Sequence, residues 1–343
     1  MLRIGIIGTG AVACYLAHQC KQQGCQVFLL SSRGTRHQAH PISQIQLFDE
    51  TKSEYAASVD LGRIAIDGHL TDYSDFLAKE FDQLYVCSKT VSNLHICQQL
   101  SRHKHCLKGP VILFQNGFST ERLFIDEALD VTIIRGVLNF SVTQHGKQKL
   151  KLRFLKTSYL GVPGQIKRIK ERSETDILAV LDLLNRVGIP FEGCTDIEHK
   201  AFAKNTLNAA ASVCGLVRSG VETAMRNSSS RTVIQAIIDE CTVIGEKAGY
   251  VRDSENFRRQ SMGYLMSIPD FKSSLVLDVL HGKETEAETL LASFINLSQR
   301  MGIAVPNLDF VYRYFDFYNT YITQSYITQS YTFTDMTLVE GDA

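Results

Sequence analysis

Apolar and polar positions at the start of the chain follow two different periods. Residues 4–7 form a short apolar run that ends at Gly8 and Gly10. A pattern with helical spacing follows and closes at Gly24, and residues 27–30 then form a second apolar run. This succession predicts a strand, a glycine turn, a helix and a second strand, which is how a dinucleotide-binding βαβ unit begins.

The glycine turn carries candidate cofactor contacts. Gly8 permits the tight turn, and Gly10 allows the backbone to come close to a pyrophosphate. The first helical N–H groups and the positive end of the helix dipole would hold the negative charge. Ala13 at the third position still allows close packing of helix on strand. We expect the contacts to the cofactor to come from Gly8, Thr9, Gly10, Ala11 and Val12.

The end of the second strand indicates which nicotinamide cofactor is used. An enzyme that prefers NAD usually has Asp or Glu there, about 20 residues past the glycines, to bind the ribose 2′-hydroxyl. This chain has Ser31, Ser32 and Arg33 instead, with Arg36 close behind. An arginine with hydroxyls suits a 2′-phosphate. We therefore expect NADP(H), with Ser32 and Arg33 as contacts.

Further strands complete the first half. Strands are expected at residues 45–48 and 63–66 as a hairpin-like excursion, at 83–87 and 111–114 in the core, at 131–135 and 137–142 continuing the sheet, and at 150–155 and 159–160 near its edge. Lys89 and Asn116 each fall just past a core strand, where doubly wound sheets bind ligands. Taken alone, each is as readily an exposed lysine or a turn asparagine.

The second half is mostly helical. Helices are expected at residues 175–187, from about 196, and at 229–248, 254–266, 284–301 and 310–321. We place the domain boundary near residue 170, which predicts a nucleotide-binding domain (1–170), a helical domain (171–322) and a tail (323–343). The sequence Tyr-Ile-Thr-Gln-Ser at 321–325 is repeated at 326–330, and its role is left open.

Composition excludes several classes of function. Lys plus Arg and Asp plus Glu both number 36, so no net field favours nucleic acid or a membrane surface. Nine cysteines without a CxxC pair, no apolar run near 18 residues and no signal-peptide layout indicate a cytoplasmic protein with reduced thiols. Cys97, His103, His105 and Cys106 match no common zinc spacing, so no metal is expected.

A polar stripe on the first long helix of the second half could carry chemistry. Lys204, Asn208 and Ser212 are four residues apart on a helix otherwise rich in alanine. A lysine there is costly unless it faces a cleft, where desolvation would lower its pKa and make it a usable proton donor. Further on, Thr285 precedes Glu286 at an expected helix start. Each piece alone is also consistent with helix capping or a surface charge.

Taken together and in order, these motifs resemble the ketopantoate reductases (2-dehydropantoate 2-reductases). The resemblance runs from residue 3 to about 320. It rests on Gly8-Thr9-Gly10, Lys89, Asn116-Gly117, Phe202-Ala203-Lys204 with Asn208, Ser274 with Asp278, Gly282-Lys283-Glu284-Thr285-Glu286, and Gly302-Ile303-Ala304-Val305-Pro306.

The resemblance implies a fold and a set of roles. The fold would be an α/β Rossmann-type domain followed by an all-α domain similar to the C-terminal domain of 6-phosphogluconate dehydrogenase. Lys204 would be the general acid that protonates the keto oxygen, and Glu286 would bind the substrate hydroxyl and contact the cofactor. The remaining implied contacts are Asn208, Ser212, Ser274 and Asn116 for substrate and nicotinamide ribose, and Lys89 for the cofactor.

Three positions depart from the family pattern. Phe202 replaces the usual tryptophan, which is a mild packing change. Ser212 replaces the second asparagine of the helix, and residues 219–223, including Glu222, stand where the family often has Pro-Asn-Gly. These last two departures lie on the substrate side. A site that hydrogen-bonds its substrate strongly rejects molecules that do not match it. The resemblance therefore indicates the type of reaction more directly than the identity of the substrate.

The expected activity is NADPH-dependent reduction of 2-dehydropantoate to (R)-pantoate, a step in pantothenate biosynthesis. The alternatives are the same chemistry on another branched 2-keto acid, a non-catalytic NADP-binding sensor, and a dehydrogenase that condenses amino and keto acids. The expected partner is a small 2-keto acid. A homodimer is compatible with the sequence, which leaves oligomeric state and kinetic constants open.

Overall fold

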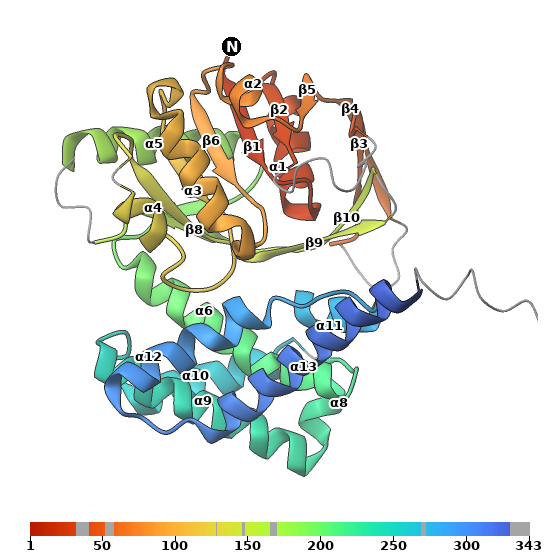
Figure 1. Cartoon of the computed structure of the whole chain (residues 1–343), viewed down its shortest axis with the longest axis vertical. Coiled ribbons are helices and arrows are strands. Elements are labelled where there is room, and N and C mark those ends of the chain that lie inside the picture. The colour runs from red at the N-terminus through yellow and green to blue at the C-terminus, as the bar shows by residue number, and fades with distance from the viewer. Residues whose placement is uncertain are drawn as a thin grey trace, which may run out of the picture. The chain divides into compact units, whose positions relative to one another are not determined.

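A computed structural model describes residues 1–31, 41–51, 58–127, 129–145, 148–164, 170–268 and 272–329. The chain divides into two compact units, Met1–Ala201 and Phe202–Ala343 (Figure 1). The first unit is an α/β unit and the second is helical, so the predicted fold class is confirmed.

The first unit is built on an eight-stranded sheet with the order β12-β11-β8-β7-β6-β1-β2-β5. Its neighbouring strands are parallel except for β11, which runs antiparallel to β8. The strands are β1 (Arg3–Ile7), β2 (Gln26–Leu30), β5 (Gly68–Leu70), β6 (Gln83–Val86), β7 (Val111–Leu113), β8 (Ile133–Val137), β11 (Ser158–Gly161) and β12 (Phe191–Gly193).

Strand β1 lies at the point where the strand order reverses. It pairs with β2 on one side and β6 on the other, and Ile7 is in register with both Leu30 and Val86. The carboxyl ends of these three strands are therefore level. In a doubly wound sheet, the crevice outside such ends is where ligands bind, so the residues just after β1, β2 and β6 are brought to one edge.

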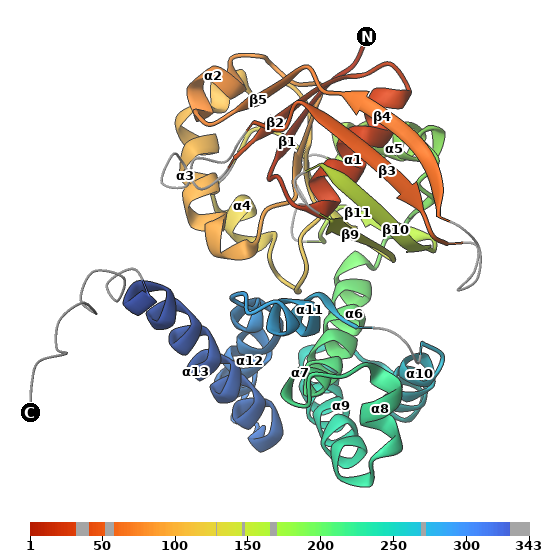
Figure 2. The ribbon, with the colours of Figure 1, turned by 90° about the vertical axis from the view of Figure 1, so that its right-hand side faces the viewer.

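Helix α1 (Ala11–Gln22) is covered on two sides. It packs on β1 and β2 of the large sheet and on the strands of a second, four-stranded sheet with the order β4-β3-β10-β9 (Figure 2). The second sheet comprises β3 (Gln44–Asp49), β4 (Val59–Ala65), β9 (Phe140–His145) and β10 (Lys149–Leu155). This double cover explains why seven of the twelve residues of α1 are buried.

The second sheet confirms one strand prediction and corrects another. The expected excursion at 45–48 and 63–66 is the antiparallel pair β3 and β4. The strands expected at 137–142 and 150–155 do not extend the large sheet, however, and form β9 and β10 of the second one. The alternating pattern of β10 buries Leu150 and Leu152 in the same core as α1, and alternation alone does not say which sheet a strand joins.

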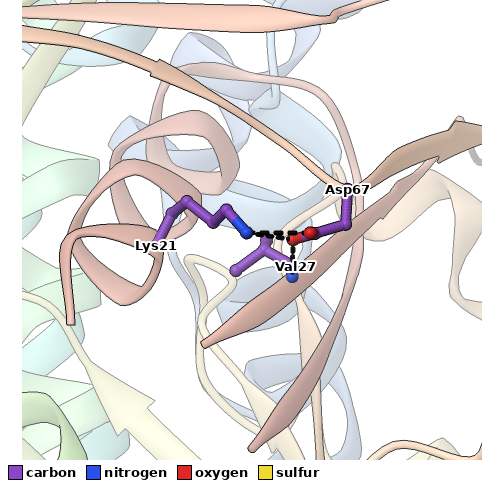
Figure 3. A network of polar contacts seen from close by, with 3 residues as sticks. All are labelled: Lys21, Val27 and Asp67. Atoms are coloured by element: carbon purple, nitrogen blue, oxygen red, sulfur yellow. Dashed lines mark hydrogen bonds and ion pairs between the residues drawn. The ribbon is translucent and has the colours of Figure 1, made fainter. Parts of the chain in front are cut away.

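Asp67 joins three elements at the amino-terminal side of β2 (Figure 3). Lys21 Nζ, at the end of α1, donates to both carboxylate oxygens at 2.8 and 2.7 Å. Val27 N–H donates to Oδ2 at 2.7 Å, and Asp67 N–H donates back to Val27 O at 3.0 Å. These bonds fix the start of β5 against β2, two residues before His69.

The remaining helices of the first unit cover the other face of the large sheet or follow its last strands. They are α2 (Tyr73–Leu77), the 3₁₀ turns η2 (Thr90–Ser92) and η3 (Lys104–Cys106), α3 (Asn93–Arg102), α4 (Arg122–Asp126) and α5 (Lys170–Arg186). Helices α2, α3 and α4 bury Phe76, Ile96 and Phe124 in one hydrophobic core together with apolar side chains of β6 and β7.

The division between the units falls later in the chain than residue 170. Helix α5 buries Val180, Leu183 and Leu184 in the core that α1 shares, and it leads into β12. The short segment after α5 supplies this strand, which pairs in parallel with β11. The alternation of helix and strand therefore continues past residue 170, and the division lies within α6 (Ile197–Ala211).

The second unit consists of helices. They are the rest of α6, α7 (Val213–Leu216), α8 (Val221–Arg226), α9 (Ser228–Ala248), α10 (Ser254–Met266), α11 (Ser274–Leu280), the π-helical segment η4 (Glu288–Ala292), α12 (Ser293–Met301) and α13 (Pro306–Gln329). Helix α13 continues past residue 321 into the tandem repeat. None of the described helices is long and apolar enough to cross a membrane.

Phe202 forms the aromatic centre of this unit. It is completely buried, stacks on Tyr250 at 4.9 Å between ring centroids and meets Phe294 edge-on at 5.3 Å. A Cβ added at Gly245 would lie 2.6 Å from the Phe202 ring. The ring therefore fills a closely packed space, which explains an aromatic residue here without reference to a substrate.

Candidate functional site

Gly8 is required by the fold itself. Its φ is +126°, in a region that other residues rarely adopt. An added Cβ would lie 2.9 Å from Ser88 N, because the β1 turn passes close to the end of β6. Gly8 N–H also donates to Leu30 O at 2.8 Å, which links the turn to the end of β2.

Gly10 has no such structural reason. Its φ of −77° and ψ of 178° are open to any residue. Among the described residues, nothing lies within 4 Å of a Cβ added there. Neither the backbone nor the described neighbours therefore require a glycine at this position.

The start of α1 suits an anion. The helix's first backbone bond runs from Cys14 N to Gly10 O, so the N–H groups of residues 11–13 have no acceptor within the helix. The N-cap residue Gly10 supplies no side-chain bond, and the first turn contains no acidic residue. Open N–H groups at a positive helix end, beside free space, fit a pyrophosphate group.

The thiol next to this turn is structural. Cys14 is buried and its Sγ donates to Thr9 O at 3.6 Å. Burial raises the pKa of the Cys14 thiol to about 12, so the group stays protonated at neutral pH and is a poor nucleophile. All nine cysteines are free, without disulfide bonds.

Lys89 and Asn116 follow β6 and β7 as expected, and both are half-buried. Their loops are joined by Gln115, whose Nε2 donates to Ser88 O at 2.8 Å and to Asn93 Oδ1 at 2.7 Å. The structure thus brings the neighbours of Lys89 and Asn116 into contact at the edge where Gly8 lies.

A buried arginine holds the turn after β7. Arg135 on β8 is 2% exposed and donates to Leu113 O at 3.2 Å and to Gly117 O at 2.7 Å. Its Nε lies 3.7 Å from the buried Glu121 carboxylate. Burial lowers the pKa of the guanidinium, and the Glu121 charge opposes this shift. In the sequence, Arg135 is the last residue of an expected strand, and its charge within an apolar run is the signal that marks it.

At the end of β2, Ser31 is buried and its hydroxyl meets the His69 ring at 2.8 Å between Oγ and Nε2. Ser32 and Arg33, predicted to contact the cofactor, lie outside the described residues. His69 was not singled out in the sequence, because one histidine in a short polar strand carries no recognisable motif.

On α6, the predicted polar stripe separates into two environments. Lys204 and Asn208 are half-buried, whereas Ser212 is completely buried, and its hydroxyl donates to Ala209 O at 2.6 Å. Asn205, beside Lys204, is 1% exposed and its Nδ2 donates to Leu290 O in η4 at 3.0 Å. This bond attaches the lysine-bearing helix to the segment that follows Glu286.

The backbone before Glu286 is held by α13. Thr285 N–H and Thr285 Oγ1 donate to Asn319 Oδ1 at 2.8 and 3.1 Å, and Asn319 Nδ2 donates to Thr285 O at 3.3 Å. Glu286 is half-buried, and its carbonyl accepts from Thr289 and Leu290 N–H, at 3.0 Å each, where the π-helical turn begins. Such turns frequently occur at functional sites.

Ser274 is the first residue of α11 and is exposed. The residue before it, Ser273, caps the helix by accepting from Val276 N–H at 3.4 Å, so the capping task does not fall to Ser274. Among the described residues, no group of three or more His, Cys, Asp or Glu side chains could hold a metal ion.

Comparison with known proteins identifies the family. A family model described as ketopantoate reductase PanE/ApbA matches residues 4–165, and one for the C terminal of the same family matches residues 196–319. The chain belongs to the ketopantoate reductase family. Members of this family are oxidoreductases.

Individual relatives are distant in sequence. An uncharacterized oxidoreductase of Bacillus subtilis (strain 168), YkpB, is 23% identical over 336 residues, which cover 90% of this chain and 95% of the relative. The structure of a dimeric ketopantoate reductase from Staphylococcus aureus is similar with a TM-score of 0.70 and 19% identity, covering 94% of this chain and all of that one. A D-mandelate dehydrogenase bound to NADH and anilino(oxo)acetate has a TM-score of 0.73 and 15% identity over 94% of this chain and all of its own. These structural similarities support the fold.

The two glycines predict different outcomes when each is changed to alanine. Gly10→Ala should leave the free energy of unfolding within about 1 kcal/mol, because its backbone is ordinary and the space around it is open. It should weaken binding of a dinucleotide at least about tenfold by obstructing the pyrophosphate. Gly8→Ala should lower the free energy of unfolding by about 1–3 kcal/mol through strain. Denaturant titration measures the free energy of unfolding of each variant, and calorimetry measures its affinity for the dinucleotide. A Gly10→Ala variant that binds normally would contradict the assigned pyrophosphate contact.

Asn319→Ala should leave the Thr285 N–H and hydroxyl without their acceptor and let the backbone of Glu286 move. If Glu286 contacts substrate, kcat/KM should fall about tenfold or more, as expected for a displaced binding group. The matched control is Tyr318→Phe, which removes a 3.4 Å bond from the same helix to Val279 O. Equal effects of the two substitutions on kcat/KM would show that Asn319 has only a packing role.

Proposed function

We propose that this protein is an NADPH-dependent reductase that converts 2-dehydropantoate to (R)-pantoate. The observation that carries the cofactor half of the proposal is the open space at Gly10 beside the unpaired N–H groups of α1. Membership of the ketopantoate reductase family supports the substrate half. The absence of a carboxylate at Ser31 favours the phosphorylated cofactor.

The proposed roles divide between the two units. The first unit binds the cofactor through Gly8 to Val12, with Lys89 and Asn116 at the same edge of the sheet. A reduced nicotinamide, when bound, supplies the hydride for the carbonyl carbon. In the second unit, the Lys204 ammonium group donates a proton to the keto oxygen, and its charge stabilises the negative charge that develops there.

The other polar groups orient the substrate. Glu286 accepts a hydrogen bond from the substrate hydroxyl, and Asn208 and Ser274 bind the carboxylate end as donors. Glu286 is well suited to this role because Asn319 holds the preceding peptide at three points. Ser212 has no part in the proposal, since its hydroxyl is buried and donates to Ala209 O in the last turn of α6.

A second candidate substrate is another bulky 2-keto acid. Ser212 and Glu222 depart from the family pattern, and D-mandelate dehydrogenase, which acts on a 2-hydroxy acid with an aromatic side chain, shares the fold. The nicotinamide chemistry and the role of Lys204 would be unchanged. Only the groups that face the substrate's side chain would differ.

The proposal includes a homodimer in the cytoplasm. A dimer is supported by the Staphylococcus aureus relative, which is described as dimeric. A reducing compartment is supported by nine free thiols, none of them in a disulfide bond.

Oxidation of NADPH and NADH with a panel of 2-keto acids tests this function. We expect 2-dehydropantoate to give the highest kcat/KM, and NADPH to exceed NADH at least about tenfold, the scale of one charge-assisted contact. Turnover of a different 2-keto acid without turnover of 2-dehydropantoate would establish the second candidate. Binding of the cofactor without turnover of any 2-keto acid, with or without an amine, would instead support the non-catalytic NADP-binding sensor.

Lys204→Ala should lower kcat at least about 10²-fold, the usual contribution of a positioned proton donor, with NADPH affinity little changed. Lys204→Arg should also be slow, since a guanidinium retains the charge but does not release a proton at neutral pH. Lys200→Ala is the matched control, because Lys200 lies one turn earlier on α6, over the Tyr159 ring at 4.4 Å. Near-normal turnover of Lys204→Ala would remove this residue from the mechanism.

A further inference from the structure

The protonation of His69 can be assigned from its two hydrogen-bond partners. Ile42 N–H lies 2.9 Å from His69 Nδ1, and a backbone N–H can only donate. Nδ1 is therefore the unprotonated acceptor. A neutral imidazole carries its one proton on the other nitrogen, so Nε2–H is the donor. Burial also lowers the pKa of His69, which favours the neutral ring.

This assignment determines how Ser31 can bond. His69 Nε2–H donates to Ser31 Oγ at 2.8 Å, so the serine oxygen accepts on that side. The hydroxyl's own hydrogen must then be directed away from His69. Ser31 is thereby presented to its surroundings as a donor.

Backbone hydrogen bonds place Ser31 at the edge of the sheet where the cofactor is proposed to bind. Ser31 directly follows β2, and Ser31 N–H donates to Leu70 O at 3.0 Å. The preceding residue, Leu30, accepts from Gly8 N–H of the glycine turn. Asp67 fixes β5, and with it His69, through its bonds to Val27 and Lys21.

Ser31 also lies where NAD-dependent Rossmann enzymes have a carboxylate, about 20 residues past the glycines. That carboxylate accepts a hydrogen bond from the ribose 2′-hydroxyl. A side chain held as a donor fits a group with acceptors only, such as a ribose 2′-phosphate. We propose that His69 is a specificity-determining residue that acts through Ser31, by holding its hydroxyl as a donor to the 2′-phosphate of NADPH. This inference rests on the proposed function, and it adds two residues to the cofactor site.

Four variants separate this arrangement from a merely structural role. Ser31→Ala removes the donor. His69→Asn keeps an oxygen near the Nδ1 position to accept from Ile42 N–H but does not reach Ser31. His69→Gln reaches the Nε2 position with an amide donor and loses the Ile42 bond. The fourth variant combines Ser31→Ala with His69→Asn.

The measured quantity is the ratio of the dissociation constants for NADH and NADPH, by calorimetry on the full chain, with 2′,5′-ADP and 5′-ADP as fragment probes. Ser31→Ala should lower the preference for NADPH about tenfold or more, the size of one bond to a charged group, with NADH affinity unchanged. His69→Asn should lower the same ratio about threefold or more, and His69→Gln should retain it. In the double variant His69→Asn should have no further effect, because it acts through Ser31.

An unchanged ratio in His69→Asn, or equal weakening of both dinucleotides, would overturn the inference. A wild-type protein that binds NADH more tightly than NADPH would overturn both this inference and the cofactor half of the proposed function. The outcomes for the variants are distinguishable from failure of the proposed function, in which neither dinucleotide binds or both bind without turnover of a 2-keto acid.

Discussion

The close approach of the β1 turn to the end of β6 is the constraint on which the nucleotide-binding half depends. Only a glycine at position 8 allows this approach, because its φ is positive and a Cβ would meet the Ser88 backbone. The same turn is bonded to Leu30 at the end of β2. The start of α1 is therefore held between three strand ends, and its unpaired N–H groups are presented at the edge of the sheet.

Around this edge, buried polar groups fix loops that would otherwise be loose. Gln115 joins the loops after β6 and β7, Arg135 holds the turn at Gly117, and His69 holds Ser31. In the helical unit, Asn319 does the same for Thr285. Each is a side chain bonded to backbone or to a second side chain, so its contribution is to position a neighbour. Buried hydrogen bonds of this kind are costly to leave half-made, which makes the loops they hold well defined.

Gly10 and Phe202, two positions of the family pattern, differ in whether packing explains them. At Gly10 the described residues give no reason for a glycine, and the proposed pyrophosphate contact would supply one. At Phe202 the reverse holds: the aromatic ring is explained by packing against Tyr250, Phe294 and Gly245. Its difference from the family's tryptophan therefore concerns the core. The departures at Ser212 and Glu222 lie elsewhere, and of these Ser212 is turned inward.

The sequence by itself determined the glycine turn, the opening strand, helix and strand, the fold class and the family, because these depend on local periodicity and on motifs in a fixed order. The expected limits of α10 match the structure, whereas α13, expected over 310–321, begins at Pro306 and continues to Gln329. Only the tertiary structure decided that β9 and β10 join a second sheet, that α5 and β12 belong to the first unit, and that Ser212 is buried. Arg135, His69 and Asn319 also came from the structure alone. Their roles come from partners 18 to 38 residues away in the chain, and no local pattern records such pairings.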